Sequence, residues 1–265
     1  MKKIVSIMLI VSTVFIALTG CGKKKETVII TGVDDLAGKK IGVQEGTTGD
    51  IYATDIENAK ISRFKKGVDA AIDLKNGKID AVILDEQPAK KIVANNKDLV
   101  ILTEEFSLED YAIAVAKGNE ELLNSINATI AKLKSNGKYQ EFLEAYIPEN
   151  GEVVIPKHDP TNFSQDIIMG TNAEFEPFEY RQGETIVGLD IELAHEIAND
   201  FEKNLKIEDM NFDSLIGALS SGKIDMIIAG MTVTDERKES VDFSDSYYTS
   251  KQVIIVRQSS NVVQD

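Results

Sequence analysis

The chain has 265 residues, a formal net charge of −15 at pH 7 and a hydrophobic fraction of 43%. This acidic balance argues against a nucleic-acid partner and against direct docking on anionic lipid, because both require clustered lysine and arginine side chains. The length permits one large domain or two modest domains once a leader has been removed.

The first twenty residues have the layout of a secretory signal. Two lysines precede an apolar run from Ile4 to Leu18, which is short for a membrane span of ~20 apolar residues. The run ends in LTGC, which resembles the bacterial lipobox, and Cys21 is the only cysteine of the chain. We predict a lipoprotein signal peptide at 1–20 and a lipid on Cys21. A buried or free thiol is the alternative.

Short apolar runs alternate with helical patterns along the rest of the chain. The strand-like runs are Lys40–Gln44, Ala81–Asp85, Leu99–Leu102, Tyr111–Ala116, Ile167–Thr171, Met226–Ala229 and Gln252–Val256. Between them, apolar residues recur at helical spacing, for example from Leu122 to Leu133 and from Leu189 to Phe201. Alternating strands and helices predict an α/β fold with parallel or mixed sheets.

A repeated phrase divides this pattern in two. The segment LKNGKIDAVILDE at 74–86 matches LSSGKIDMIIAGM at 219–231. Each copy is typical of a helix end, a glycine C-cap, a short turn and a buried strand. Any joint between a helix and a strand could look similar, but the shared GKID in the same context favours two similar α/β lobes.

The segment 147–166 fits neither lobe. It holds three of the five prolines of the chain and shows no sustained period. We predict that it is a linker between two contiguous pieces, at about 27–146 and 167–258.

The charged candidates suit a small zwitterion. Arg237 follows a strand end and could form a bidentate pair with a carboxylate, or only a surface salt bridge. Thr47 and Thr48 stand at a helix start, where backbone N–H groups suit a carboxylate; simple N-capping is the alternative. Asp85 ends a strand and could receive an ammonium group, although a helix N-cap is equally compatible.

The remaining candidates are aromatic or imidazole side chains. Phe175 and Phe212 offer apolar faces to a ligand, or belong to the core. His158 lies in the linker, and His195 lies on the polar side of its helix, so we expect it to be solvated. The two histidines lack metal-ligand spacing, and no glycine-rich phosphate loop is evident, so we predict no metal and no cofactor.

Several long phrases resemble the polar amino-acid substrate-binding proteins of ABC importers, solute-binding protein family 3. In 167–257 the phrases that resemble the family's opening half are GTNAEFEPFEY, VGLDIELAHEIA, FDSLIGALSSGKIDMIIAGMTVTDERKESVDFSDSYY and QVIIVR. In 34–146 the phrases that resemble its closing half are DDLAGKKIGVQEGTTG, GKIDAVILDEQPA and YAIAVAKGNEELLNSINATIAKLKSNGKYQEF. The resemblance implies a type II periplasmic-binding fold, with two Rossmann-like lobes around a cleft. Because the halves stand in reverse order, it also implies a circular permutation.

The resemblance implies a division of the chain. The parts would be an anchor stalk and hinge strand at 21–32, a small lobe at 33–104, a large lobe at 105–146 plus 167–258, and a linker at 147–166 joining the usual termini. One covalent crossing between the lobes would remain near Thr103–Asp110, and the other would be rebuilt from Gln252–Arg257 meeting Thr27–Thr31. A strand-exchanged dimer and a fragment of a tandem protein are the alternatives to a closed monomer.

Matching positions carry over a ligand site. The implied ligand-binding residues are Gln44, Thr47, Thr48, Asp85, Asn172, Phe175, Phe212, Ala229, Gly230, Thr232 and Arg237. Arg237 would hold the α-carboxylate, aided by Thr232 and the amides at the predicted helix start. Asp85 would hold the α-ammonium group together with the carbonyl of Gly230.

Phe175 and Phe212 would sandwich the ligand side chain, as in the family, but two other positions depart from the family pattern. Asn172 stands where many members have aspartate, which weakens the case for a strongly cationic ligand. Gln44 stands where glutamine-binding members lead us to expect lysine. The resemblance therefore implies a polar amino acid, glutamine-like or basic, without naming it.

The resemblance implies a lipid-anchored, extracytoplasmic substrate-binding protein at the bacterial cell membrane. It would capture a polar L-amino acid by lobe closure and deliver it to the permease of an ABC importer. The alternatives are a cyclohexadienyl-dehydratase-like enzyme on the same fold and an amino-acid sensor domain. Arg237 and Asp85 suit a whole amino acid and so favour binding. The lack of a second long apolar run disfavours a sensor.

Overall fold

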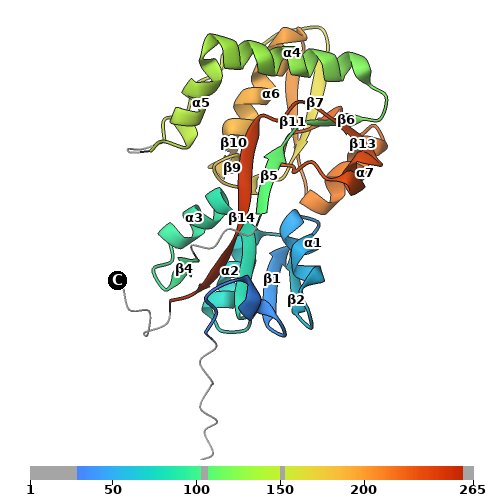
Figure 1. Cartoon of the computed structure of the whole chain (residues 1–265). Coiled ribbons are helices and arrows are strands. Elements are labelled where there is room, and N and C mark those ends of the chain that lie inside the picture. The colour runs from blue at the N-terminus through green and yellow to red at the C-terminus, as the bar shows by residue number, and fades with distance from the viewer. Residues whose placement is uncertain (1–28, 103–106, 150–152, 259–265) are drawn as a thin grey trace, which may run out of the picture.

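The computed structural model describes residues 29–102, 107–149 and 153–258 (Figure 1). Within these ranges the chain forms two α/β lobes, and strand β14 (Tyr248–Arg257) runs from one lobe into the other. The α/β fold class is thus confirmed. The predicted signal peptide and Cys21 lie outside the described residues. None of the helices within these ranges is long and apolar enough to span a membrane.

The smaller lobe is built on a sheet with the strand order β2-β1-β3-β14-β4. Besides β14, its strands are β1 (Lys40–Gln44), β2 (Lys60–Phe64), β3 (Ala81–Asp85) and β4 (Leu99–Ile101). Its helices are η1 (Val33–Leu36), α1 (Thr48–Asp55), α2 (Gly67–Lys75) and α3 (Glu86–Ala94). Every residue of β3 is buried, which is why this central strand reads as a continuous apolar run.

The larger lobe is built on a second sheet, with the order β11-β7-β12-β6-β13. Its strands are β6 (Ala114–Ala116), β7 (Asp166–Thr171), β11 (Asn204–Asp209), β12 (Met226–Ile227) and β13 (Val241–Phe243). A smaller sheet holds β8 (Glu174–Phe175), β9 (Glu179–Gln182) and β10 (Thr185–Val187). The helices are α4 (Glu120–Asn136), α5 (Lys138–Tyr146), α6 (Leu189–Asp200), η2 (Phe212–Ser214), α7 (Leu215–Ser220) and α8 (Asp235–Lys238).

The larger lobe draws on both sides of the linker. Strand β6 precedes the linker, yet it pairs antiparallel with β12 and β13, which follow it. Helices α4 and α5 also precede the linker and pack against α6. On α4, the apolar residues from Leu122 to Leu133 that recur at helical spacing are buried, as their period predicts.

Two neighbouring strands connect the lobes. The first half of β14 pairs antiparallel with β5 (Ser107–Tyr111), and its second half pairs with β3 and β4. The family resemblance places all of 167–258 in the large lobe, whereas Gln252–Arg257 pairs with β3 and β4 in the sheet of the smaller lobe. The expected meeting of this strand with Thr27–Thr31 involves residues 27 and 28, which lie outside the described ranges; Thr31 itself donates a backbone hydrogen bond of 2.8 Å to Asp35.

The linker residues at 153–165 are docked on the larger lobe. His158 stacks on His195 of α6 with ring centroids 3.7 Å apart, and its Nε2 lies 2.8 Å from Oε2 of the buried Glu192. Glu192 also accepts a hydrogen bond of 2.7 Å from the hydroxyl of Tyr146 at the end of α5. The expectation of a solvated His195 is wrong, since His158 covers it and burial lowers the pKa of His195 to about 4.

Candidate ligand-binding site

A small cavity lies between the lobes, where the carboxyl ends of β1 and β3 face those of β7 and β12. Its lining consists of Gln44, Thr47, Thr48, Asp85, Asn172, Phe175, Glu179, Phe212, Ala229, Gly230, Thr232 and Arg237. Eleven of these are the residues expected from the sequence, and Glu179 is the one that was missed. The cavity has a volume of about 10 Å³, roughly the room for one water molecule. A larger ligand therefore requires the lobes or their side chains to move apart.

The cationic side of the cavity is the guanidinium of Arg237, which is 7% exposed. It donates hydrogen bonds to the carbonyl oxygens of Thr232 (2.7 Å) and, across the lobes, Gly46 (2.9 Å). It also lies 5.3 Å from the ring centroid of Phe212. Burial lowers the pKa of Arg237. These two hydrogen bonds use two of its five N–H donors, so the side chain is oriented while it can still bind a carboxylate.

The anionic side of the cavity is centred on Asp85 at the end of β3, which accepts a short hydrogen bond from the hydroxyl of Tyr111. Burial, and then the charge of Glu109, raise the pKa of Asp85 to about 7. Glu109 lies on β5 and accepts hydrogen bonds from Thr232 Oγ1 (2.9 Å) and Gln252 Nε2 (3.1 Å). This second carboxylate was not expected from the sequence, and its negative charge lies close to Asp85.

The two positions that depart from the family pattern contact each other. Gln44 Nε2 donates to Asn172 Oδ1 across the lobes at 2.8 Å, and both side chains are buried. Asn172 Nδ2 in turn donates to the backbone oxygen of Met210 at 2.9 Å. The contact is therefore a neutral amide pair joined by one hydrogen bond.

Glu179 and Asp190 form a fully buried carboxyl pair beside the cavity. Asp190 Oδ2 accepts hydrogen bonds from the backbone N–H of Gly230 (2.8 Å) and the hydroxyl of Tyr247 (2.9 Å). Burial raises the pKa of Asp190 to about 6, and burial together with the charge of Asp190 raises the pKa of Glu179 well above its usual range. Both oxygens of Glu179 and Oδ1 of Asp190 lack an N–H or hydroxyl donor among the described residues. One proton shared between the two carboxyl groups would satisfy one oxygen of Glu179 and Oδ1 of Asp190.

Close packing against a glycine positions the aromatic wall of the cavity. Gly230 follows β12 with a φ of +51°, and a Cβ atom there would lie 2.6 Å from the ring of Phe175. The ring of Phe175 also lies 5.7 Å from that of Phe178, between centroids. A larger residue at position 230 would therefore both strain the backbone and displace the aromatic wall.

Comparisons with known proteins agree with the family resemblance. The family model of bacterial extracellular solute-binding proteins, family 3, matches residues 167–264. The arginine-binding extracellular protein ArtP of Bacillus subtilis is 47% identical over 96 residues, which cover 36% of this chain and 38% of that protein. The L-cystine-binding protein TcyJ of Escherichia coli is 32% identical over 126 residues, 47% of each chain.

Solved structures match over similarly limited lengths. A substrate-binding protein of an amino acid ABC transporter is 54% identical over 30% of this chain and 37% of its own, with a TM-score of 0.30. The chain spans less than half the length of each relative named above. Within the matched segment, the resemblance to solute-binding protein family 3 is confirmed.

Replacing Asp85 by asparagine tests the electrostatic cost of this site. Burial raises the pKa of Asp85 from 3.8 to about 7 in the folded protein. Between these pH values the folded protein keeps a proton that the unfolded chain releases. The loss of folding stability caused by Asp85 therefore grows as pH rises from 4 to 7 and is complete above 7. We expect Asp85→Asn to raise the free energy of unfolding by on the order of 2–4 kcal/mol at pH 8 and to change it little at pH 4. Thermal unfolding at both pH values measures this.

The control for this experiment is Asp235→Asn, because the side chain of Asp235 is fully exposed. It should leave stability unchanged at both pH values. An Asp85→Asn protein that is destabilised equally at pH 4 and pH 8 would contradict the assignment.

Proposed function

We propose that the cavity between the lobes binds a polar L-amino acid, and that the protein delivers this ligand to the permease of an ABC importer. The observation that carries the proposal is that Arg237 and Asp85, far apart in sequence and on opposite lobes, line one buried cavity. Opposite charges on either side of a cleft suit the two charges of an α-amino acid, and they reach the same ligand only when the lobes are together.

The α-carboxylate would bind to Arg237 and to the first backbone N–H groups of α1, near Thr47 and Thr48. The α-ammonium group would bind to the carboxylate of Asp85. Arg237 and Asp85 are both buried and have lost most of their hydration. A ligand charge of opposite sign would compensate each of them for that loss.

The ligand side chain would lie between Phe175 and Phe212 and end near the Gln44–Asn172 pair. A neutral amide could exchange hydrogen bonds with this pair. A cationic side chain could instead donate a hydrogen bond to Glu179, which supplies a carboxyl group at the cavity although Asn172 is not acidic. Relatives named for arginine, histidine and cystine support the class of polar amino acids. We therefore propose a glutamine-like or basic ligand.

A screen of the twenty amino acids by thermal shift tests this function. At a concentration of 100 times its dissociation constant, a ligand adds about 2.7 kcal/mol to the free energy of unfolding. We expect polar or basic amino acids to give this shift. Arg237→Ala should lose about 2–5 kcal/mol of binding free energy, because it leaves a ligand carboxylate buried without its partner. Calorimetry measures the loss.

Lys238→Ala is the matched control, since Lys238 lies next to Arg237 on α8 but its side chain is 53% exposed. It should bind like the parent. Parental affinity in Arg237→Ala would remove Arg237 from the site. Turnover of arogenate or prephenate without any shift by amino acids would favour the dehydratase alternative.

We further propose that the protein is extracytoplasmic and anchored by a lipid on Cys21. The lipobox-like LTGC after a short apolar run supports this. Cells that express Cys21→Ser should release the protein from the membrane fraction, and the parent should carry a lipid by mass spectrometry. A lipid-free parent, together with a variant that stays fully membrane-bound, would overturn the anchor.

We also propose that the halves of the chain are circularly permuted relative to the family. The support is the reversed order of the family phrases and the antiparallel pairing of β14 with strands from residues 81–111. A variant in which 167–258 precedes 29–146 restores the family order and a continuous second crossing. Without ligand it should have a smaller radius of gyration in small-angle scattering, because a continuous crossing restrains opening. If the two proteins have the same radius of gyration without ligand, the interrupted crossing does not loosen the hinge between the lobes. A doubled mass of the unaltered protein would indicate strand exchange between two chains.

A further inference from the structure

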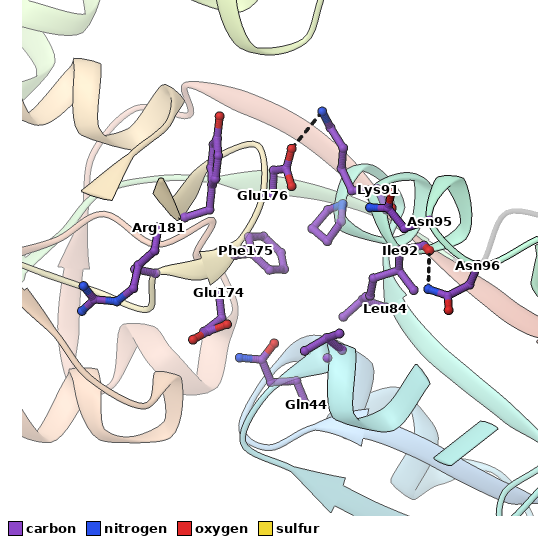
Figure 2. Close-up of a pocket in the computed structure, with 15 residues that line it drawn as sticks. Gln44, Leu84, Lys91, Ile92, Asn95, Asn96, Glu174, Phe175, Glu176 and Arg181 are labelled. Carbon is purple, nitrogen blue, oxygen red and sulfur yellow. Dashed lines mark hydrogen bonds and ion pairs between the residues drawn. The ribbon is translucent and has the colours of Figure 1, made fainter. Parts of the chain in front are cut away.

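A second interlobe cavity, here called the rim pocket, lies next to the ligand cavity. It has a volume of about 300 Å³ and lies between α2 and α3 of the smaller lobe and β8 and β9 of the larger lobe (Figure 2). Leu84 and Ile92 give it an apolar surface on one side, and Phe175 faces them from the other lobe (Figure 2). Val68 of α2 also lines the pocket. Its size is at the lower end of the range for small-molecule sites.

The rim pocket and the ligand cavity share two lining residues, Gln44 and Phe175. These side chains therefore form the partition between the two spaces. Phe175 is held against Gly230, and Asn172 is held by Met210. Gln44 is fixed to the other lobe through its hydrogen bond to Asn172. A rotation of Gln44 would thus open the partition at the cost of one neutral hydrogen bond.

The mouth of the rim pocket carries both signs of charge. Lys91 pairs with Glu176 at 3.1 Å across the lobes, and Glu174, which also lines the pocket, pairs with Lys66 outside its lining at 2.5 Å. The side chains of Lys91 and Glu176 are 33% and 40% exposed. Partly exposed ion pairs are weak, so either partner can exchange to a charged group on a ligand. An apolar floor with a charged mouth suits a short carbon chain that ends in a carboxylate or an ammonium group.

We propose that the ligand cavity opens past Gln44 into the rim pocket, so that the site takes amino acids whose side chain is extended through an amide, the isopeptide class. This inference rests on the proposed function, because the α-amino and α-carboxylate groups bind as for the shorter amino acid. The extension lies on Val68, Leu84 and Ile92, and its charged end binds to Lys91 or Glu176.

Two matched pairs of probes test the inference by calorimetry: L-glutamine with γ-L-glutamylglycine, and L-lysine with Nε-glycyl-L-lysine. We expect the parent to bind an extended probe. Val68→Trp fills the rim pocket from an exposed position and does not alter the lining of the ligand cavity. It should weaken the extended probe by about tenfold or more and the short probe by less than about twofold.

Ile72→Trp is the matched control, one turn further along α2, exposed, and outside the lining of the rim pocket. It should bind both probes like the parent, and thermal unfolding checks that both variants fold. Equal affinity of the extended probe for the parent and Val68→Trp would overturn the inference. So would a parent that binds a short amino acid but neither extended probe, an outcome that leaves the proposed function standing. A parent that binds no amino acid of either kind would overturn both proposals.

Discussion

The pairing of β5 with the first half of β14 is the constraint on which the rest of the structure depends. Because the second half of β14 is an inner strand of the smaller lobe's sheet, this pairing fixes how the lobes face each other. It also brings Glu109 and Gln252 side by side. Glu109 accepts from Thr232 of the larger lobe, and Gln252 donates to Glu109 and to Thr48 of the smaller lobe. One chain of hydrogen bonds thus joins both edges of the cleft.

The site is electrostatically costly because its ionisable side chains are buried. Burial shifts the pKa values of Arg237 and Asp85 in opposite directions, which means that folding disfavours the charged form of each. Glu179 and Asp190 carry the same cost and lie against the same cavity. A hydrophobic isostere would remove this cost, but it would also remove the opposite charges that recognise a zwitterion in the proposed function. Groups that lower stability while providing complementary charge are the expected signature of a binding site.

The sequence pattern predicted the elements whose formation depends on neighbouring residues. The helical period of α4, the continuous apolar run of β3 and the GKID turns before β3 and β12 all follow from the sequence. The sequence pattern could not predict the burial of side chains that are covered by segments distant in the sequence. Glu179 is buried because α6 brings Asp190 against it, and its only sequence signal is its place between two aromatic residues. His195 looked solvated because its cover, His158, comes from a linker without periodic pattern.

The larger lobe makes the two pieces of the chain mutually dependent. Without β6, strands β12 and β13 lose their shared neighbour, and without α4 and α5 the apolar face of α6 loses its cover. Both come from before the linker, so the segment 167–258 alone leaves this sheet incomplete and exposes that face. The linker joins the two pieces covalently and so gives them a high effective concentration for each other. The contacts of His158 with His195 and Glu192 hold the linker on α6. The cavity takes Gln44, Thr48 and Asp85 from the first piece and Arg237 from the second, so its lining is complete only in the same assembly.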